Sequence, residues 1–308
     1  MSKKKVITKC GAVSIVGRPN VGKSTLLNSI LEEKISIVSK IPQTTRSQIR
    51  GIYNDVRGQI IFIDTPGLHH GADALDKAMN VASTSTISDA DCLIYLVDLS
   101  RQTGEEEDYV AHQVARAKVP VILGLNKIDI GSKRMPTYIE FWERVKGCPV
   151  QEMKDFKILP LSGEKGENVD VLIDILFDFL PVGPALYDHD TISDMPRKLV
   201  IAEIIREKLF QMTRQEVPHS IGVLIEHMQP IKKKTMLIKA LVLVERDTQK
   251  EIVIGKGGAL IKKVGVDARK ELEELLGQKV FLELYVKADK NWRNDPSRLQ
   301  ELGYDLLS

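Results

Sequence analysis

An octapeptide near the N-terminus has the residue types and spacing of a phosphate-binding loop: Gly17-Arg18-Pro19-Asn20-Val21-Gly22-Lys23-Ser24. It fits the pattern GxxxxGK[ST], in which backbone N–H groups surround phosphate oxygens at the start of a helix. An apolar run precedes the loop, and a helical pattern that begins at Thr25 follows it. We therefore expect Gly17 to Thr25 to bind phosphates, with Lys23 at the β- and γ-phosphates of a nucleotide and the Ser24 hydroxyl on Mg²⁺.

A second polar segment, Asp64-Thr65-Pro66-Gly67, comes directly after an apolar run at residues 60–63. A carboxylate at the end of a strand beside a phosphate loop can hold Mg²⁺, usually through water. The Gly67 N–H can sense a γ-phosphate. We therefore expect Asp64 to serve the metal and Gly67 the phosphate, in a segment that changes shape with the nucleotide.

A third polar segment, Asn126-Lys127-Ile128-Asp129, follows the apolar run at residues 121–125. A carboxylate at Asp129 can accept hydrogen bonds from the ring N–H and the exocyclic amine of guanine. Adenine offers neither arrangement, so such a site rejects ATP by leaving polar groups unpaired. Ser162 and Gly163 follow the last apolar run of this half, where a backbone N–H can meet the guanine carbonyl.

The elements that must position these segments are short buried strands alternating with stretches of helical length. The apolar runs that predict strands lie at residues 12–16, 60–63, 92–97, 121–125 and 158–161. This alternation predicts an α/β domain with a mostly parallel sheet and helices on both faces. A helix over residues 169–180 ends at the proline-rich residues 181–184. We therefore place a nucleotide domain at 1–182, a linker at 183–196 and a second domain at 197–308.

The second domain has a different pattern. Helical spacing covers residues 199–212 and 259–275, and the predicted strands are 221–226, 236–245 and 280–286. We therefore predict a smaller α+β domain. Residues 228–270 carry 11 basic and 4 acidic side chains, although the whole chain has a net charge of only +2. This local charge suggests a polyanion as partner, although a solvated charged face is the commoner cause of such a stretch.

Composition excludes several other classes of protein. The 308 residues are 43% hydrophobic and 28% charged, which excludes wholesale disorder. The three cysteines share no CxxC spacing, so neither a disulfide scaffold nor a cysteine zinc site is supported. The sequence contains no run of eighteen apolar residues, the length that predicts a membrane-spanning helix. The N-terminus does not resemble a signal peptide. We expect a cytoplasmic protein.

A short glycine-rich segment, Ile254-Gly255-Lys256-Gly257-Gly258, lies between two helical patterns of the second domain. It fits the GxxG loop with which KH domains clamp a single-stranded nucleic-acid backbone. The pattern alone is weak, because residues 163–166 also fit it. Only the second copy lies in the basic region, however. We add Lys262, one helical turn beyond the loop, as a further phosphate contact. The run Lys232-Lys233-Lys234 between the two strands is either a solvated hairpin turn or a further phosphate contact.

The nucleotide segments, in this order, resemble those of GTPases of the translation-factor class. Arg18-Pro19-Asn20 and Pro42-Gln43-Thr44-Thr45-Arg46 resemble, more narrowly, the Era-like GTPases of the TrmE-Era-EngA group. This resemblance implies two switches that respond to GTP and Mg²⁺. The first comprises Gln43, Thr44, Thr45 and Arg46, with Thr45 as the magnesium ligand and Thr44 as its alternative; the second comprises Asp64, Thr65, Pro66, Gly67 and Leu68.

The resemblance also bears on hydrolysis. Many GTPases place a water-orienting glutamine where this chain has Leu68. We therefore expect slow intrinsic conversion of GTP and water to GDP and phosphate, and we assign no general base. Relatives with an asparagine at the position of Asn20 can use K⁺ beside the phosphates, which implies K⁺ as a further cofactor. Gly163 replaces the alanine usual in the family, with little expected effect.

In the second half, segments such as Gly183-Pro184-Ala185-Leu186-Tyr187-Asp188 and Asn291-Trp292-Arg293 resemble the Era family, whose second domain is a type II KH domain. The resemblance covers nearly the whole chain. It implies binding of the 3′ end of small-subunit (16S) ribosomal RNA and a role in small-subunit assembly and maturation. It also implies peripheral association with the inner membrane, and we expect no stable homo-oligomer. Trp292 and Tyr285 can either stack on bases or pack in the core.

The alternative function is a membrane-surface regulatory GTPase whose basic C-terminal domain binds acidic lipid. Lysines such as Lys232 serve either function. The glycines of the GxxG loop distinguish the two, because lipid binding needs cations but not a close approach of the backbone.

Overall fold

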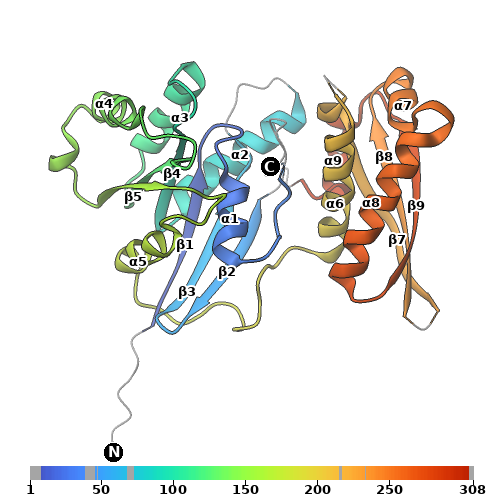
Figure 1. Ribbon diagram of the computed structural model, residues 1–308, viewed down its shortest axis with the longest axis horizontal. Helices are drawn as coiled ribbons and strands as arrows, with labels where there is room; N and C mark the ends of the chain where they lie inside the picture. Colours follow the sequence, from blue (N-terminus) through green and yellow to red (C-terminus); the bar gives the residue numbers. More distant parts are fainter. Residues whose placement is uncertain are drawn as a thin grey trace, which may run out of the picture. The chain divides into compact units, whose positions relative to one another are not determined.

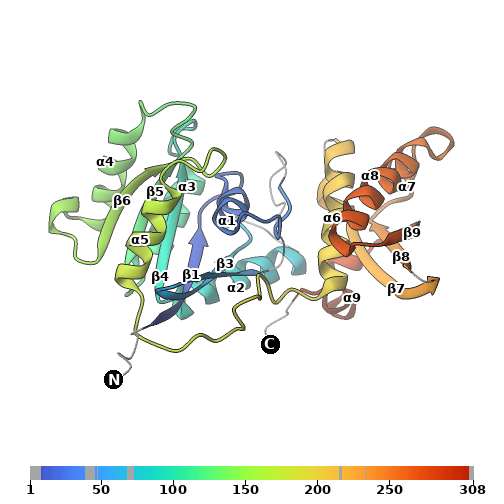
Figure 2. The same cartoon turned by 60° about the horizontal axis from the view of Figure 1, so that its bottom comes forward.

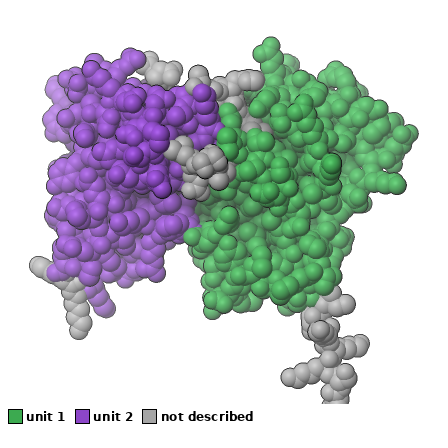
Figure 3. Space-filling view, turned by 180° about the vertical axis from the view of Figure 1, so that it is seen from behind, with its two compact units in different colours: residues 1–36, 45–70, 79–194 green, residues 37–44, 71–78, 195–308 purple. Residues whose placement is uncertain are grey.

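The computed structural model describes residues 8–38, 46, 48–67, 73–214, 217–232 and 234–304. The chain divides into two compact units, shown in different colours in Figure 3. The first unit comprises Met1–Ser36, Thr45–His70 and Met79–Asp194, and the second comprises Ile37–Thr44, Gly71–Ala78 and Met195–Ser308. In the second half of the chain, the first unit ends at Asp194 and the second resumes at Met195. The domain boundaries predicted at residues 182 and 197 remain predictions.

The first unit is built on a six-stranded sheet in the order β2-β3-β1-β4-β5-β6. Only the β2–β3 pair is antiparallel. The strands are β1 Lys9–Val16, β2 Ile49–Asp55, β3 Gly58–Asp64, β4 Cys92–Asp98, β5 Val121–Asn126 and β6 Phe156–Leu161. All five predicted strands are present, so the mostly parallel sheet is confirmed. The additional strand β2 was missed, because only part of it is buried and its hydrophobic signal is short.

Helices cover both faces of this sheet, as predicted (Figures 1 and 2). They are α1 Lys23–Leu31, α2 Ala74–Asp89, α3 Glu105–Ala115, α4 Met135–Lys146 and α5 Val169–Phe179, with a short 3₁₀ turn at Val150–Glu152. On the side of α3 and α4, Tyr95 of β4 and Trp142 of α4 lie ring to ring, 5.3 Å between centroids. This tight packing fixes α3 and α4 against the strands whose ends carry the polar segments.

The end of the first unit runs along its own sheet. The backbone N–H of Ile52 in β2 donates to the carbonyl of Ile192 at 2.8 Å, and Gly51 and Ser193 form an isolated bridge. Residues before Asp194 that we assigned to a linker are therefore attached to the edge of this sheet.

The second unit has a three-stranded sheet in the order β7-β8-β9, in which β7 and β8 are antiparallel and β8 and β9 are parallel. Buried side chains such as Ile205 of α6 and Val264 of α8 form its core with the sheet. The order helix-strand-strand-helix-helix-strand predicted for a type II KH arrangement is confirmed. Its elements are α6 Arg197–Met212, β7 Gly222–Lys232, β8 Thr235–Val244, α7 Asp247–Ile254, α8 Ala259–Leu276, β9 Lys279–Ala288 and α9 Pro296–Glu301, with 3₁₀ turns at Pro218–Ser220, Lys256–Gly258 and Trp292–Asn294.

A search of the described residues for a membrane-spanning helix finds none that is both long enough and apolar enough.

Candidate functional site

The predicted phosphate loop connects β1 to α1. Gly22 stands immediately before α1 with a φ of 102°, in the left-handed region that favours glycine. A Cβ atom at Gly22 would lie 2.5 Å from Nδ2 of Asn126. Glycine is therefore needed here both for the backbone conformation and for the close approach of Asn126.

Protein donors bind the backbone carbonyls of this loop. Lys23 Nζ donates to the carbonyls of Gly17 and Arg18, at 3.0 and 3.2 Å. Lys127 Nζ donates to the carbonyl of Asn20 at 3.1 Å, and Asn126 Nδ2 donates to that of Val21 at 2.7 Å. Carbonyl oxygens repel a phosphate. A loop that binds anions through its N–H groups must therefore direct its carbonyl oxygens toward other donors of the protein, as these hydrogen bonds do.

The Lys23 side chain is buried. Burial lowers its pKa to about 8, and the nearby carboxylates of Asp64 and Glu107 offset part of that effect. A desolvated ammonium gains a strong partner in a polyphosphate, because charge-assisted hydrogen bonds are strongest where water is excluded.

The two predicted magnesium ligands that the structure describes lie together. Ser24 Oγ donates to Asp64 Oδ2 at 2.6 Å, and Ser36 Oγ donates to the same oxygen at 3.0 Å. A hydroxyl and a carboxylate are hard oxygen ligands, and Mg²⁺ is held by few such groups together with water and phosphate oxygens. Ser24 and Asp64 therefore fit the metal. Sequence reasoning missed Ser36, which belongs to no motif.

The predicted guanine site lies beside the same loop. Asn126 Oδ1 accepts from the backbone N–H of Gly163 at 3.0 Å, so one side chain joins the phosphate loop to residues 162–163. Ser162 is buried and its hydroxyl accepts from the backbone N–H of Lys165. Asp129 is exposed at the end of the turn after β5. The structure thus brings the three predicted segments together.

Asp98 is a site residue that sequence reasoning missed. Its Oδ2 accepts from Lys127 Nζ at 2.7 Å, and Ser100 donates to its Oδ1. Burial acts to raise the pKa of Asp98, but the bonds from Lys127 and Ser100 hold it below its ordinary value. The signal was available, because Asp98 ends β4 just as Asp64 ends β3.

Arg18 is the one basic residue of the phosphate loop before Lys23. It lies in the phosphate loop, but its side chain is buried, with Nε 2.9 Å from Glu107 Oε2 in α3. The guanidinium is therefore bound by the protein rather than presented to a phosphate. Only the Arg18 backbone remains a candidate phosphate contact.

The switch segments are partly described. Thr65 is buried, and its hydroxyl donates to the carbonyl of Ile15 at 3.1 Å. Arg46 is also buried. The predicted switch residues Gln43, Thr44, Thr45 and Leu68 lie outside the described residues, as does Lys233 of the lysine run.

The GxxG segment lies between α7 and α8 as predicted. Gly255, Gly257 and Gly258 all have positive φ values, between 59° and 79°, which side chains rarely adopt. Lys256 and Gly257 are exposed at this turn, and Lys262 is exposed on the next turn of α8. The loop thus presents exposed backbone and an exposed cation, as binding of a phosphodiester chain requires.

The lysine run lies elsewhere in the second unit. Lys234 is exposed in the turn between β7 and β8, and its carbonyl accepts from the backbone N–H of Lys279, which follows α8. The GxxG loop precedes α8, which has 18 residues and therefore a length of roughly 27 Å. A nucleic acid must therefore span the length of α8 to reach both.

The two aromatic candidates differ. Trp292 is fully buried and its Nε1 donates to the carbonyl of Ser220 at 3.2 Å, so it is a packing residue. Tyr285 is 50% exposed on β9, with its hydroxyl donating to Glu283. Of these two, only Tyr285 is placed to stack on a base.

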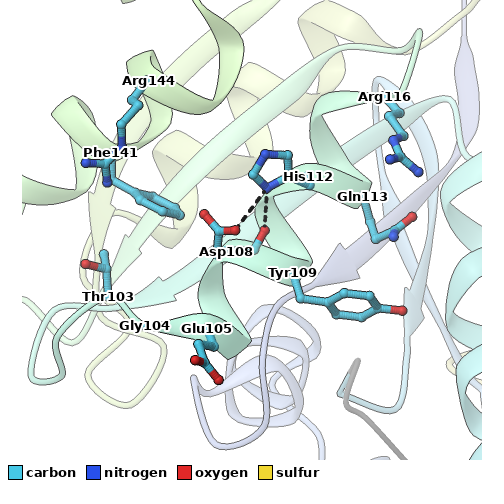
Figure 4. A pocket seen from close by; sticks show the side chains of 10 residues that line it. All are labelled: Thr103, Gly104, Glu105, Asp108, Tyr109, His112, Gln113, Arg116, Phe141 and Arg144. Carbon is cyan, nitrogen blue, oxygen red and sulfur yellow. Dashed lines mark hydrogen bonds and ion pairs between the residues drawn. The ribbon is translucent and has the colours of Figure 1, made fainter.

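A surface groove of about 850 Å³ lies between α3 and α4 (Figure 4). Asp108 and His112 of α3 and Phe141 and Arg144 of α4 contribute to its lining. It contains none of the predicted site residues.

Comparison with known proteins identifies both halves of the chain. Residues 12–127 match the family model described as a 50S ribosome-binding GTPase, and residues 216–293 match the KH domain model. The GTPase Era of Halothermothrix orenii is 42% identical over 296 residues, which cover 96% of this chain and 98% of that protein. The GTPase Era of Lactobacillus helveticus is 42% identical over 298 residues, which cover 96% of each.

Two solved structures are similar over nearly the whole chain. One is a single-residue variant of Aquifex aeolicus Era bound to GDP.AlF4⁻, with a TM-score of 0.90, 38% identity and coverage of 97% of this chain and 100% of that one. The other is Era in complex with MgGDPNP and nucleotides 1506–1542 of 16S ribosomal RNA, with a TM-score of 0.91 and the same identity and coverage. With a phosphate loop, a guanine segment and a KH domain in one chain, this protein belongs to the Era family of GTPases.

Proposed function

We propose that this Era-family GTPase binds the 3′ end of small-subunit ribosomal RNA through its KH domain and assists small-subunit assembly and maturation. One observation carries this proposal: the chain joins a GTP site to an exposed, cationic GxxG loop, and an Era structure that is similar over 97% of the chain holds that RNA. In this function, Lys256 and the glycines beside it bind the RNA backbone.

The test is binding of a single-stranded RNA that copies the 3′ tail of 16S ribosomal RNA, against a scrambled RNA of equal length, at fixed salt and with a non-hydrolysable GTP analogue. We expect tighter binding of the native sequence. The variant Lys256→Asp/Gly257→Asp should lose at least roughly tenfold in affinity, because it places two negative charges where phosphates bind. GTP hydrolysis without RNA should remain as in the unaltered protein.

Lys290→Asp is the matched control, because Lys290 is an exposed lysine of the same unit outside the GxxG loop. It should bind RNA nearly as well as the unaltered protein. Equal binding of native and scrambled RNA, or full RNA affinity in the Lys256→Asp/Gly257→Asp variant, would contradict the proposal.

Peripheral contact with the cytoplasmic face of the inner membrane is a second proposal, carried by the exposed lysines of the second unit. Acidic lipid attracts such side chains without any need for glycine. Vesicles of acidic phospholipid, with neutral vesicles as control, test it directly. Intact RNA binding together with absent vesicle binding would remove the membrane proposal and leave the RNA proposal standing.

A further inference from the structure

The buried Arg18 side chain makes one ion pair and two hydrogen bonds inside the first unit. Its Nε lies 2.9 Å from Glu107 Oε2, its Nη1 donates to the carbonyl of Gln102 at 3.1 Å, and its Nη2 donates to the hydroxyl of Tyr138 at 2.9 Å. The planar guanidinium thus meets acceptors from α3, from α4 and from the loop between β4 and α3. A lysine has no such fork and could satisfy only part of this arrangement.

The acceptors of Arg18 are themselves held. Tyr95 of β4 donates its hydroxyl to Glu107 Oε1 at 2.6 Å, and Glu107 is completely buried. The Tyr138 hydroxyl lies 3.1 Å from the carbonyl of Asp98, whose side chain binds Lys127. We call the buried side chains of Tyr95, Glu107 and Tyr138 the Arg18 seat. Gln102 is itself exposed and contributes only its backbone carbonyl.

The seat contacts the phosphate loop through Arg18. Arg18 belongs to the phosphate loop, and its own carbonyl accepts from Lys23. The next four residues of the loop include Asn20 and Val21, whose carbonyls are bound from the guanine segment. A loop fixed at its side chain and at successive carbonyls has little freedom to change the direction of its N–H groups.

We propose that Arg18 is a positioning residue for the phosphate loop and that Glu107, with Tyr95 and Tyr138, forms the seat that fixes it. The Arg18 side chain acts on nucleotide through the direction of the loop N–H groups, and it touches neither the phosphates nor the reacting water. The proposal adds α3 and α4, through Glu107 and Tyr138, to the parts of the fold that determine nucleotide affinity. It requires equal effects on GTP and GDP, because both place phosphates in this loop.

Arg18→Met tests this directly. The variant should bind GTP and GDP more weakly by roughly 10–100-fold, by analogy with the loss of metal affinity when a residue that orients a metal ligand is removed. Its preference for GTP over ITP should not change, because the guanine segment is intact. The melting temperature should fall by roughly 5–10 °C, because Glu107 is left as an unpaired buried charge.

A double variant separates positioning from stability. Arg18→Met/Glu107→Gln removes both charges, keeps an acceptor for Tyr95, and should recover most of the lost melting temperature. If Arg18 positions the loop, nucleotide affinity stays low in this stable variant. Recovery of full GTP and GDP affinity together with stability would show that Arg18 serves only the fold, and would overturn the proposal.

Glu106→Gln is the matched control. Glu106 precedes Glu107 in α3 but is exposed, and Figure 4 shows its neighbours Glu105 and Asp108 beside the surface groove. This variant should keep the nucleotide affinity and melting temperature of the unaltered protein. A loss of nucleotide affinity in Glu106→Gln as large as in Arg18→Met would also contradict the proposal, because the effect would then belong to the charge of α3.

Discussion

At the scale of single residues, we predict that Asp129 determines the choice of base. It is exposed at the turn after β5, while Asn126 and Lys127 of the same segment are tied to the phosphate loop. This division suggests that Asn126 and Lys127 build the pocket and that Asp129 alone presents acceptors to the two guanine donors. Replacement of Asp129 should therefore change specificity and leave the loop intact.

Asp129→Asn should weaken GTP binding by roughly 100-fold, because an amide group places a donor against a guanine donor. Xanthosine triphosphate has a carbonyl in place of the guanine amine and should bind the variant better than GTP. Nucleotide competition measures both affinities, with Asp155→Asn as a control at a residue outside the site. An unchanged preference for GTP would contradict the assignment of Asp129.

The sequence predicts the site residues that belong to a motif. It misses the residues outside the motifs that position them. Asp64, Asn126 and Gly163 stand where the motifs place them. The direction of the Arg18 side chain follows instead from Glu107 and Tyr138, which lie 89 and 120 residues further along the chain. No spacing rule encodes such a long-range contact. Asp98 could have been predicted more easily, because it stands at the end of an apolar strand, as Asp64 does.

At the scale of elements, the strands of the parallel sheet are predictable because each contains a continuous apolar run, and β4 and β5 are buried at every residue. β2 is different. It lies at the sheet edge, and its partners include the chain that follows β6 and α5. Gln59 of β3 shows how that segment is held, because its side chain binds Leu186 and Tyr187 through three hydrogen bonds of 2.8–3.0 Å.

Gln59→Ala should release this attachment. We expect a loss of about 1–2 kcal/mol in the free energy of unfolding, because two backbone N–H groups lose their acceptor. Hydrogen exchange at Leu186 and Tyr187 should become faster, while exchange in β4 and β5 stays slow. The exposed Gln151→Ala is the control. Unchanged exchange at Leu186 and Tyr187 would show that Gln59 does not hold the segment.

At the scale of the whole molecule, the division into units is informative. The second unit includes Ile37–Thr44, which overlaps the first predicted switch at residues 43 and 44, and Gly71–Ala78, which begins three residues after the second predicted switch. Within that unit, Arg293 Nε donates to Asp73 Oδ2 at 2.6 Å, and Glu207 accepts from the backbone N–H of Val38. Residues near the predicted switches along the chain are thus bound by residues of the KH-containing unit. The account therefore predicts that nucleotide and RNA affect one another.

Such coupling must be reciprocal, because the free energy that links two binding events is the same in either order. We expect the affinity for the 3′ tail RNA to be roughly 5–150-fold higher with a GTP analogue than with GDP, the usual range for coupled sites. The affinity for the GTP analogue, relative to GDP, should rise by the same factor when the RNA is present.

The most direct test is therefore one set of titrations: RNA affinity with GTP analogue, with GDP and without nucleotide, together with analogue and GDP affinity with and without RNA. The account predicts the tightest RNA binding with the GTP analogue and an equal factor in both directions. RNA affinity that is the same in all three nucleotide states, with nucleotide affinity unmoved by RNA, would contradict the claim that GTP controls RNA binding in this protein.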